Sequence, residues 1–435
     1  MLVRRRKSRI YFLRKCFDYP LRLSCDTVMN LGFLRVIRIG LSYLRARVFP
    51  IRQEKTLEAF FINRFGAELY RLFFKSYTEK VWGVPCERIS ASWGVQRIKG
   101  LSILKALSNA VSRLFRRSQD MRQKDVETSL VEKFLYPKYG PGQMWDTCAR
   151  KVSAMGGEIR MQCSVRNIHI ENDRVTAVTI WNDASGCEET LQGDYFFSTM
   201  PIKDLIRGME TQVPDKVREV SEGLIYRDFI TVGLLLDDLK IHDHTPQGKR
   251  LISDNWIYIQ EPDVLVGRLQ VFNNWSPYMV ADRSKVWIGL EYFCFEVDDL
   301  WKLSDEEMTK LAIEELARIG IIEATQVRDH TVIRMPKTYP AYFGSYDRFD
   351  ELWEWIDRVE NLFLVGRNGM HRYNNQDHSM LTAMVAVDNI IAGQHDKSNI
   401  WGVNTEQEYL EERVRPADRG PLQKERSLSR RAIAS

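Results

Sequence analysis

The segment from Asn361 to Ser379 constrains the fold of this 435-residue chain more than any other. It opens with a short, continuously apolar run at 362–365, which is typical of a buried parallel strand. Gly366 and Gly369 follow, and a helix is predicted from about 379 to 391. A strand that ends in glycines beside a helix N-terminus lets backbone approach a ligand closely. We therefore expect a crevice there for an anionic or electron-rich ligand.

A plainer interpretation of the same segment is an ordinary strand-to-helix turn. In that case Asp377 would be the helix N-cap, and Arg367 would form an ion pair at the surface. Spacing alone does not separate the two interpretations.

The rest of the chain predicts alternating helical and strand-rich stretches. Thr56 is placed to cap a packing helix that ends near Trp82. Helices are also predicted at 93–114, 143–155 and 305–319, and strands at 159–165, 174–181, 194–199, 229–236, 256–260, 267–273 and 286–292. The charged tail is expected to be disordered beyond 415.

Charge is concentrated at the N-terminus. Residues 1–52 carry 13 Lys and Arg against Asp18 and Asp26, a balance of +11, whereas the whole chain is at +5. Arginines interrupt an apolar stretch at 31–49, so this stretch could form a basic amphipathic helix on anionic lipid, or a helix packed on an acidic surface. Nucleic acid is not expected as a partner, because the body of the chain is not basic and has no recognised binding motif.

Cysteine and histidine patterns exclude several kinds of site. The seven cysteines are scattered and contain no CxxC pair, which favours a reducing, cytoplasmic setting. His242 and His244 form an HxH without a third ligand, so no metal site is predicted. No apolar run is long enough to span a membrane.

Several ordered motifs resemble one superfamily. The segment NLFLVGRNGMHRYNNQD (361–377) resembles the C-terminal flavin-contacting segment of the amine-oxidase and UDP-galactopyranose mutase superfamily. The stretch at 136–168 resembles the glycine turn, helix and meander of the same proteins, and GDYFFSTMP (193–201) resembles their return strand. SYTEKVWGVPC (76–86) is similar to a motif of bacterial protoporphyrinogen-oxidase-like oxidoreductases. The resemblance runs from Leu2 to about Glu411.

The resemblance implies an α/β, two-domain flavoprotein with an α+β substrate domain and an incomplete Rossmann-like FAD domain. We expect a mainly helical part of the substrate domain at 1–135, FAD-domain segments at 136–205 and 331–400, a sheet-containing substrate domain at 206–330 and a charged tail at 401–435. It implies FAD as cofactor, bound by Gly366, Arg367, Asn368, Tyr373, Asn375, Asp377, His378 and Ser379.

The implied activity is FAD-dependent oxidation of a small molecule by hydride transfer. The substrate contacts expected from aromatic and polar residues are Tyr226, Arg227, Trp256, Asn274, Arg334, Tyr339 and Tyr342. Single tyrosines and tryptophans at such spacing also commonly pack a sheet. No general base is identified from the sequence.

Two departures from the superfamily pattern shape the alternatives. The sequence contains no GxGxxG, the fingerprint that cradles a pyrophosphate, so a truncated or split chain with weak or absent FAD binding is one alternative. A mutase-like isomerase that uses reduced flavin is another. The mutases carry Tyr-Tyr-Asp where this chain has Tyr373-Asn374-Asn375, which places that alternative second.

Overall fold

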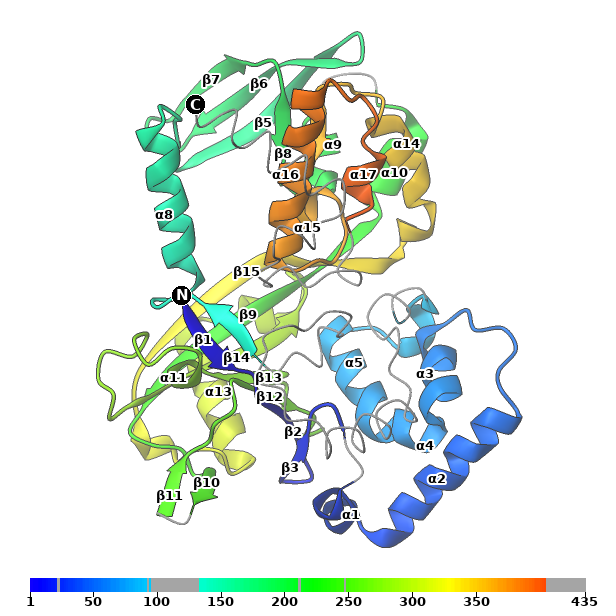
Figure 1. The fold of residues 1–435 in the computed structure, drawn as a ribbon, viewed down its shortest axis with the longest axis vertical. Helices are drawn as coiled ribbons and strands as arrows, with labels where there is room; N and C mark the ends of the chain where they lie inside the picture. The colour runs from blue at the N-terminus through cyan, green and yellow to red at the C-terminus, as the bar shows by residue number, and fades with distance from the viewer. Residues whose placement is uncertain (22–23, 92–93, 95–132, 210–212, 246–247, 404–435) are drawn as a thin grey trace, which may run out of the picture. The chain divides into compact units, whose positions relative to one another are not determined.

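The computed structural model describes residues 1–435 except 22–23, 92–93, 95–132, 210–212, 246–247 and 404–435 (Figure 1). The predicted helix at 93–114 and the tail beyond 403 lie outside the described residues. The chain forms two units. Unit 1 contains the described residues within 1–117, 129–161 and 223–347, and unit 2 those within 162–222 and 348–403. The predicted domain boundaries stay a prediction.

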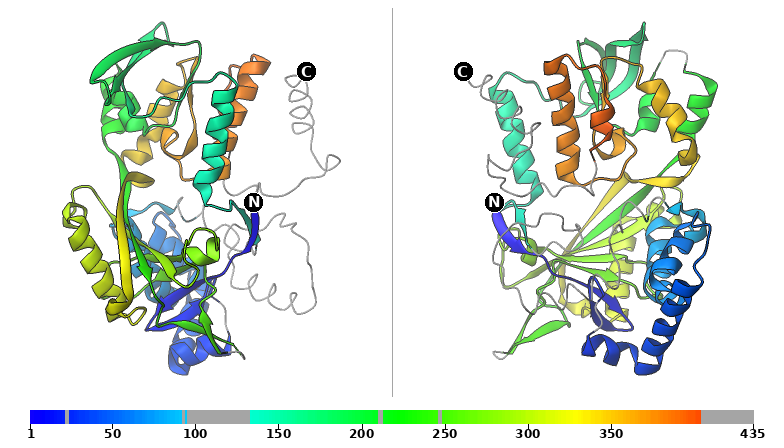
Figure 2. Two further views of the ribbon diagram at one scale, coloured as in Figure 1. Left: turned by 90° about the vertical axis from the view of Figure 1, so that its left-hand side faces the viewer. Right: turned by 45° about the vertical axis from the view of Figure 1, so that its right-hand side comes forward.

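A seven-stranded sheet is the centre of unit 1, in the order β15-β9-β14-β13-β12-β2-β3 (Figures 1 and 2). All neighbours are antiparallel except β12 and β2. The strands are β2 (Ser8–Phe12), β3 (Lys15–Asp18), β9 (Leu224–Leu236), β12 (Trp256–Ile259), β13 (Arg268–Val271), β14 (Val286–Cys294) and β15 (Val327–Gly344).

One face of this sheet forms the main apolar core. Ile257, Leu269, Leu290 and Val232 lie side by side across four strands and pack with helix α13 (Asp305–Arg318). The helix begins with a capping box in which Ser304 and Glu307 bond each other's backbone N–H groups. Because side chains alternate along a strand, the residues next to these in sequence lie on the opposite face of the sheet.

The remaining elements of unit 1 are mainly helical. The Thr56 hydroxyl accepts from the Ala59 N–H, which confirms the predicted cap. The helices are α1 (Cys25–Leu31), α2 (Phe33–Val48), α3 (Leu57–Phe65), α4 (Ala67–Leu69), a π-helical turn (Tyr70–Lys75), α5 (Ser76–Trp82), α8 (Pro141–Ala154), α11 (Phe272–Trp275) and α12 (Asp299–Lys302). Two small antiparallel pairs join β1 (Leu2–Arg5) to β4 (Lys133–Tyr136) and β10 (His242–Thr245) to β11 (Gly248–Leu251).

Unit 2 contains a three-stranded meander and a separate pair of parallel strands. The meander is formed by β5 (Cys163–Glu171), β6 (Arg174–Asn182) and β7 (Cys187–Gln192), and the parallel pair by β8 (Phe196–Ser198) and β16 (Leu362–Leu364). The helices are α9 (Ile202–Arg207), α10 (Asp215–Glu222), α14 (Phe349–Ile356), α15 (Gly366–Gly369), α16 (Gln376–Ala392) and α17 (Ser398–Trp401).

The structure corrects several predicted elements. Strand β5 begins at Cys163, so the alternating residues at 159–162 precede it. Helix α16 begins at Gln376, its N-cap is Asn375, and Asp377 lies inside the first turn. Strands β2, β3 and β15 were not expected. The pairing of β2 with β12 joins residues about 250 positions apart, which no local pattern encodes.

Strand β15 was not predicted because it contains two prolines. Pro336 and Pro340 each lack an N–H, and a proline in a run argues against a strand. In the structure, the register of β15 against β9 shifts at both positions, between Met335 and Tyr339 and after Pro340. The strand thus accommodates each proline at an irregularity. No helix among the described residues is both long and apolar enough to cross a membrane.

Candidate functional site

The segment predicted to bind a ligand lies at the carboxyl edge of the β8–β16 pair in unit 2. The two strands run parallel with Leu364 opposite Ser198, so both end at the same edge. The Val365 N–H donates to the Ser198 carbonyl at 3.0 Å and continues the pairing to the last residue before the turn. This confirms the predicted buried parallel strand at 362–365, since all three β16 residues are buried.

Two glycines shape the turn after β16. Gly366 has φ of 75°, and its N–H donates to the Thr382 hydroxyl at 3.0 Å, which ties the turn to α16. A Cβ on Gly369 would lie 2.5 Å from the Ser198 carbonyl oxygen. The first glycine is needed for its backbone conformation and the second for close approach of two backbones. Any side chain at 369 would push the turn away from β8.

Arg367 is held by the backbone of the loop that follows α15. Its Nε and Nη2 donate to the Asn374 carbonyl at 3.1 and 2.8 Å, and its guanidinium lies 4.6 Å from the centre of the Tyr373 ring. The Asn374 side chain is buried and accepts a 2.7 Å hydrogen bond from Ser379. The arginine is therefore fixed close to the first turn of α16.

The N-terminus of α16 adds a positive dipole end to this edge. The helix has 17 residues, and the Asn375 side chain forms no capping hydrogen bond. Asp377 accepts from His378 Nδ1 at 2.8 Å. Burial acts to raise the pKa of Asp377, but the His378 ring and the backbone N–H groups of the turn outweigh it, so the pKa lies below its usual value.

Two buried polar atoms at this edge have no hydrogen-bond partner within the described chain. They are the Ser198 hydroxyl and His378 Nε2, on residues that are 9% and 2% exposed. With Nδ1 bonded to Asp377, Nε2 is the ring nitrogen left to bond a ligand. A buried unsatisfied group of this kind costs about 1–3 kcal/mol. Such atoms are expected where a ligand or water completes the site.

The structure brings all eight predicted cofactor contacts into one segment of unit 2. Gly366, Arg367 and Asn368 form most of α15, and Tyr373 to Ser379 lead into α16. The sequence analysis missed Ser198, Asn374 and Thr382. Ser198 ends the predicted return strand and could have been found from the expected parallel pairing, whereas Thr382 gave no signal in the sequence.

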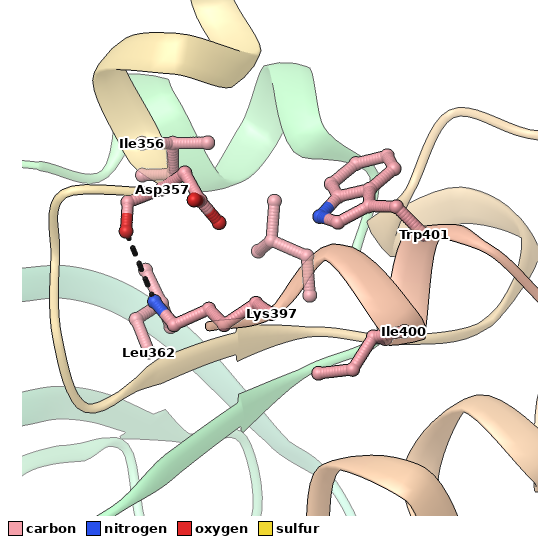
Figure 3. Close-up of a pocket in the computed structure, with 7 residues that line it drawn as sticks. Ile356, Asp357, Leu362, Lys397, Ile400 and Trp401 are labelled. Atoms are coloured by element: carbon pink, nitrogen blue, oxygen red, sulfur yellow. Dashed lines mark hydrogen bonds between the residues drawn. The ribbon is translucent and has the colours of Figure 1, made fainter. Parts of the chain in front are cut away.

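A nearby cavity in unit 2 is too small to be a ligand site (Figure 3). It measures about 10 Å³ and is lined by Ile356, Asp357, Leu362, Leu364, Lys397, Ile400 and Trp401. Lys397 Nζ donates to the carbonyls of Asp357 and Val359 at 3.2 and 2.7 Å. Burial lowers the pKa of Lys397. This space is a packing junction with room for one water at most.

All the predicted substrate contacts lie in unit 1, where most of them bond to the protein itself. Arg227 on β9 is 4% exposed and donates to the carbonyls of Val81 and Phe293 at 2.8 and 2.9 Å. A Cβ on Gly83 would lie 2.8 Å from the guanidinium carbon of Arg227. Burial lowers the pKa of Arg227 despite the nearby Asp298. This arginine holds the end of α5 on the sheet.

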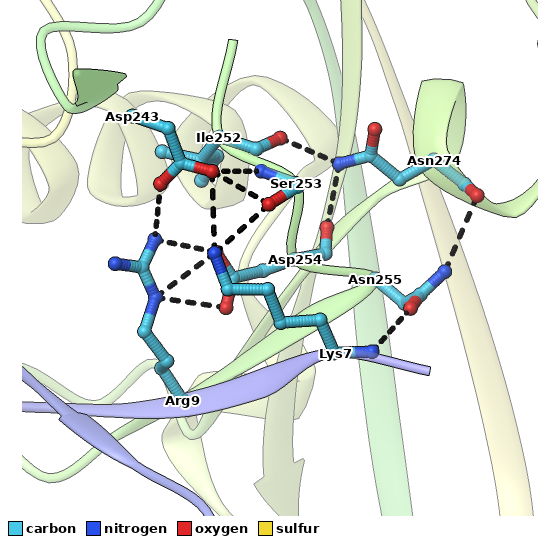
Figure 4. Close-up of polar contacts among 8 residues, drawn as sticks. All are labelled: Lys7, Arg9, Asp243, Ile252, Ser253, Asp254, Asn255 and Asn274. Carbon is cyan, nitrogen blue, oxygen red and sulfur yellow. Dashed lines mark hydrogen bonds and ion pairs between the residues drawn. The ribbon is translucent and has the colours of Figure 1, made fainter. Parts of the chain in front are cut away.

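Asn274 belongs to a polar network around the ends of β2 and β12 (Figure 4). Its side-chain amide donates to the carbonyls of Ile252 and Asp254, both at 2.7 Å, and its own carbonyl accepts from Arg4 and Asn255. Arg9 forms a 2.5 Å ion pair with Asp254, whose side chain is fully buried. The network fixes β2 beside β12.

The other predicted substrate contacts are also engaged. Arg334 bonds to Asp305 at 2.5 Å and to the carbonyls of Trp301 and Leu303. Trp256 stacks on Trp275 with ring centres 5.5 Å apart. Tyr226 and Tyr342 are buried, and the Tyr339 hydroxyl accepts from Arg268 at 3.2 Å.

A polar and aromatic row on the sheet face opposite α13 was missed by the sequence analysis. Tyr258, Arg268 and Glu291 are adjacent across β12, β13 and β14. Arg268 pairs with Glu291 at 3.1 Å, and Gln270 donates to Glu291 at 2.5 Å. Burial lowers the pKa of Arg268, but the negative charge of Glu291 outweighs this effect, so the pKa of Arg268 lies above its usual value. The alternation of Trp256 with Tyr258 and of Arg268 with Gln270 was the available signal.

The SYTEKVWGVPC motif has a structural role in unit 1. Lys80 Nζ donates to the carbonyls of Ile259, Glu261 and Val266 at 3.0–3.3 Å, and burial lowers its pKa to about 8. Glu79 accepts from the Cys86 N–H at 3.2 Å. The motif thus attaches α5 to the end of β12.

Comparison with solved structures identifies proteins that share this fold. No family model matches the chain. The chain is similar to a crystal structure of reduced UDP-galactopyranose mutase, with a TM-score of 0.72 and 20% identity over 94% of this chain and 83% of the mutase. It is also similar to a candidate protoporphyrinogen oxidase from Exiguobacterium sp. 255-15, with a TM-score of 0.60 and 14% identity over 91% of this chain and 82% of that one.

A third similar structure is wild-type putrescine oxidase bound to putrescine, with a TM-score of 0.53 and 13% identity over 90% of this chain and 82% of the oxidase. At these identities the comparison establishes a shared fold. The chain has the two-domain fold of these structures, as the sequence motifs predicted.

Proposed function

We propose that this protein is an FAD-dependent oxidoreductase that oxidises a small molecule by hydride transfer to the flavin. The observation that carries the proposal is the β8–β16 edge, where glycine backbone, Arg367 and the N-terminus of α16 meet two unsatisfied buried polar atoms. The flavoprotein fold supports the choice of ligand.

The residues at this edge fit an anionic, hydrogen-bonding cofactor. Gly366 and Gly369 keep the turn free of side chains, and Arg367 with the α16 N-terminus supplies positive potential. His378 Nε2 and the Ser198 hydroxyl would each form a hydrogen bond with the bound cofactor. Asn368, Tyr373, Asn375 and Ser379 complete the proposed contact set. FAD, when bound, would supply the hydride acceptor.

For the substrate we propose the polar face of the seven-stranded sheet. Arg268, Gln270 and Glu291 offer both signs of charge and an amide, with Tyr258 and Tyr339 beside them. Such a surface suits a polar small molecule that carries a carboxylate, phosphate or amine. The replacement Gln270→Leu should raise KM more than it lowers kcat, because Gln270 would contribute to binding in the ground state.

A mutase-like isomerase is the second candidate, favoured by the TM-score of 0.72 to the reduced mutase. Asn374 argues against this candidate, because it occupies the position of the second tyrosine of the mutase motif. Its side chain is buried and accepts a hydrogen bond from Ser379. The two candidates differ in chemistry. Bleaching of the flavin by substrate without a sugar nucleotide supports the oxidoreductase, whereas saturable quenching of tryptophan fluorescence by a UDP-sugar supports the mutase.

The cofactor proposal is tested by adding FAD to the purified chain and recording visible difference spectra. We expect saturable binding that is weak enough to be lost on desalting, because the sequence contains no GxGxxG. The variant Arg367→Met should weaken binding, and Arg207→Met, at an exposed arginine of the same unit paired with Glu222, serves as the control. Equal FAD affinity in the wild type and Arg367→Met would contradict the proposal.

A further inference from the structure

Helix α2 is attached to unit 1 by one face only. The Ser42 hydroxyl accepts from the Glu68 N–H at 3.1 Å, and Ala46 is buried. Gly66 approaches so closely that a Cβ there would lie 2.7 Å from the backbone nitrogen of Tyr43. Val36 and Ile39 complete this half-buried face toward α3 and α4. Helix α2 therefore packs on α3 and α4 through this face.

The opposite face of α2 is an exposed apolar stripe. Its members follow a spacing of three and four residues, which aligns them along one side of a helix. The members and their exposed fractions are Leu34 (75%), Ile37 (42%), Leu41 (62%), Leu44 (60%) and Val48 (66%). Phe33 and Phe49 extend the stripe at its two ends, at 70 and 76% exposure. A contiguous apolar surface of this length marks an interaction site.

Arginines accompany the stripe, and acidic residues are absent from it. Residues 33–52 contain five arginines and no Asp or Glu. Within the described chain, Arg35, Arg38 and Arg45 form no ion pair with a carboxylate, and Arg47 bonds to the Tyr43 hydroxyl. The positive charge around α2 is thus not neutralised by the described part of the protein.

A shallow cavity of about 160 Å³ lies between α2 and the segment 68–72. It is lined by Arg35, Arg38, Ile39, Glu68, Arg71 and Leu72. Glu68 is paired with Arg71 at 3.0 Å, which leaves two arginines to face the cavity with uncompensated charge. A phosphate group is the ligand chemistry that such a pair of guanidinium groups recognises.

We propose that α2 binds along the surface of an anionic phospholipid bilayer. The apolar stripe would enter the interface between headgroups and acyl chains, while arginines at the border of the stripe contact headgroup phosphates. A second copy of this chain fits less well, because two facing stripes would bring ten unbalanced arginines together. Nucleic acid gives no place for the apolar residues.

The proposal is tested by flotation of the full chain with vesicles of phosphatidylcholine alone or with about 30% phosphatidylglycerol. We expect binding to the anionic vesicles only, and loss of most of that binding at about 0.5 M NaCl, where the Debye length falls below 5 Å. Binding to neutral vesicles at the same level would overturn the electrostatic part of the proposal.

Variants separate the two kinds of contact. The pair Leu41→Asn and Leu44→Asn should reduce the partition coefficient about tenfold, and so should Arg35→Gln with Arg38→Gln. Both pairs are solvent-exposed, so the fold should persist, which circular dichroism verifies. The control is Val297→Asn with Ile391→Asn, two residues that are 78 and 58% exposed elsewhere and should leave vesicle binding unchanged.

Three outcomes would overturn the proposal. One is vesicle binding by both α2 variants at the wild-type level. Another is a stable dimer in analytical ultracentrifugation that Leu41→Asn with Leu44→Asn dissociates, since the stripe would then serve self-association. The third is binding of duplex DNA or inorganic phosphate in the absence of any binding to anionic vesicles.

Discussion

The polar network around Asn274 in unit 1 and the β8–β16 edge in unit 2 use buried polar groups in opposite ways. In the network, both amide hydrogens and the backbone carbonyl of Asn274 bond within the protein, and the Asp254 carboxylate is paired with Arg9. At the edge, the Ser198 hydroxyl and His378 Nε2 have no partner in the described chain.

This difference separates structural residues from candidate ligand contacts. When a group that already has partners is removed, those partners stay buried without a hydrogen bond or ion pair, and the fold is destabilised. Removal of a group without a partner costs little in the free protein and affects only what binds there. Each prediction below measures the free energy of unfolding or the ligand affinity on one side of this comparison.

The largest expected effect is in the network. The replacement Arg9→Met leaves the buried carboxylate of Asp254 with only the more distant Lys7 as a cation, at 3.8 Å, which should lower the free energy of unfolding by about 3 kcal/mol. Urea denaturation measures the change. The double variant Arg9→Met with Asp254→Leu should recover most of the loss, and a single variant as stable as the wild type would show that the pair is not buried in solution.

A smaller loss is expected for Asn274→Leu. The carbonyls of Ile252 and Asp254 would each lose their donor, at a cost of about 2 kcal/mol in the free energy of unfolding. The same denaturation experiment applies. The matched control is Asn182→Leu at the end of β6, where the amide accepts from N–H groups of the exposed β6–β7 turn instead of buried groups. If FAD or substrate binding fell while stability stayed unchanged, Asn274 would be a ligand contact, as the sequence suggested.

The pH dependence of stability should reveal Asp243 in the same network. Burial tends to raise its pKa, but Ser253 and Lys7 lower it from 3.8 to about 2. Since the folded-state pKa lies below the unfolded value, the stabilisation is present above pH 3.8 and is lost as the pH falls toward 2. The difference in stability between wild type and Asp243→Asn should therefore shrink over that interval, and a constant difference would contradict this assignment.

The smallest effect on stability is expected at the edge. Ser198→Ala removes an unpartnered hydroxyl and should change the free energy of unfolding by less than about 0.5 kcal/mol, or raise it slightly. FAD affinity should nevertheless fall by about fivefold, the worth of one hydrogen bond. A large loss of stability in this variant would mean that the hydroxyl is bonded within the protein.

The sequence predicted the local geometry of the edge well. A continuous apolar run, two glycines and a helical periodicity are local signals, and they placed β16, the turn and α16 to within three residues. The helix start was misplaced because Asp377 is a common N-cap residue, whereas Asn375 occupies the N-cap position without a side-chain bond.

The non-local parts of the candidate site could not be predicted in the same way. Ser198 lies opposite Leu364 only because β8 and β16 pair across more than 160 residues. The partners of Arg227 and Asn274 are mostly backbone carbonyls, which a sequence does not display. The structure shows that Arg227 holds α5 on the sheet, and its predicted contact with a substrate stays a prediction.

The central claim is that the β8–β16 edge binds FAD, and a titration of the purified chain with FAD tests it most directly. Difference spectra should show saturable binding by the wild type, weaker binding by Ser198→Ala and by Arg367→Met, and unchanged binding by the control Arg207→Met. No saturable binding at any FAD concentration up to about 1 mM, the affinity limit of a weak specific site, would contradict the claim.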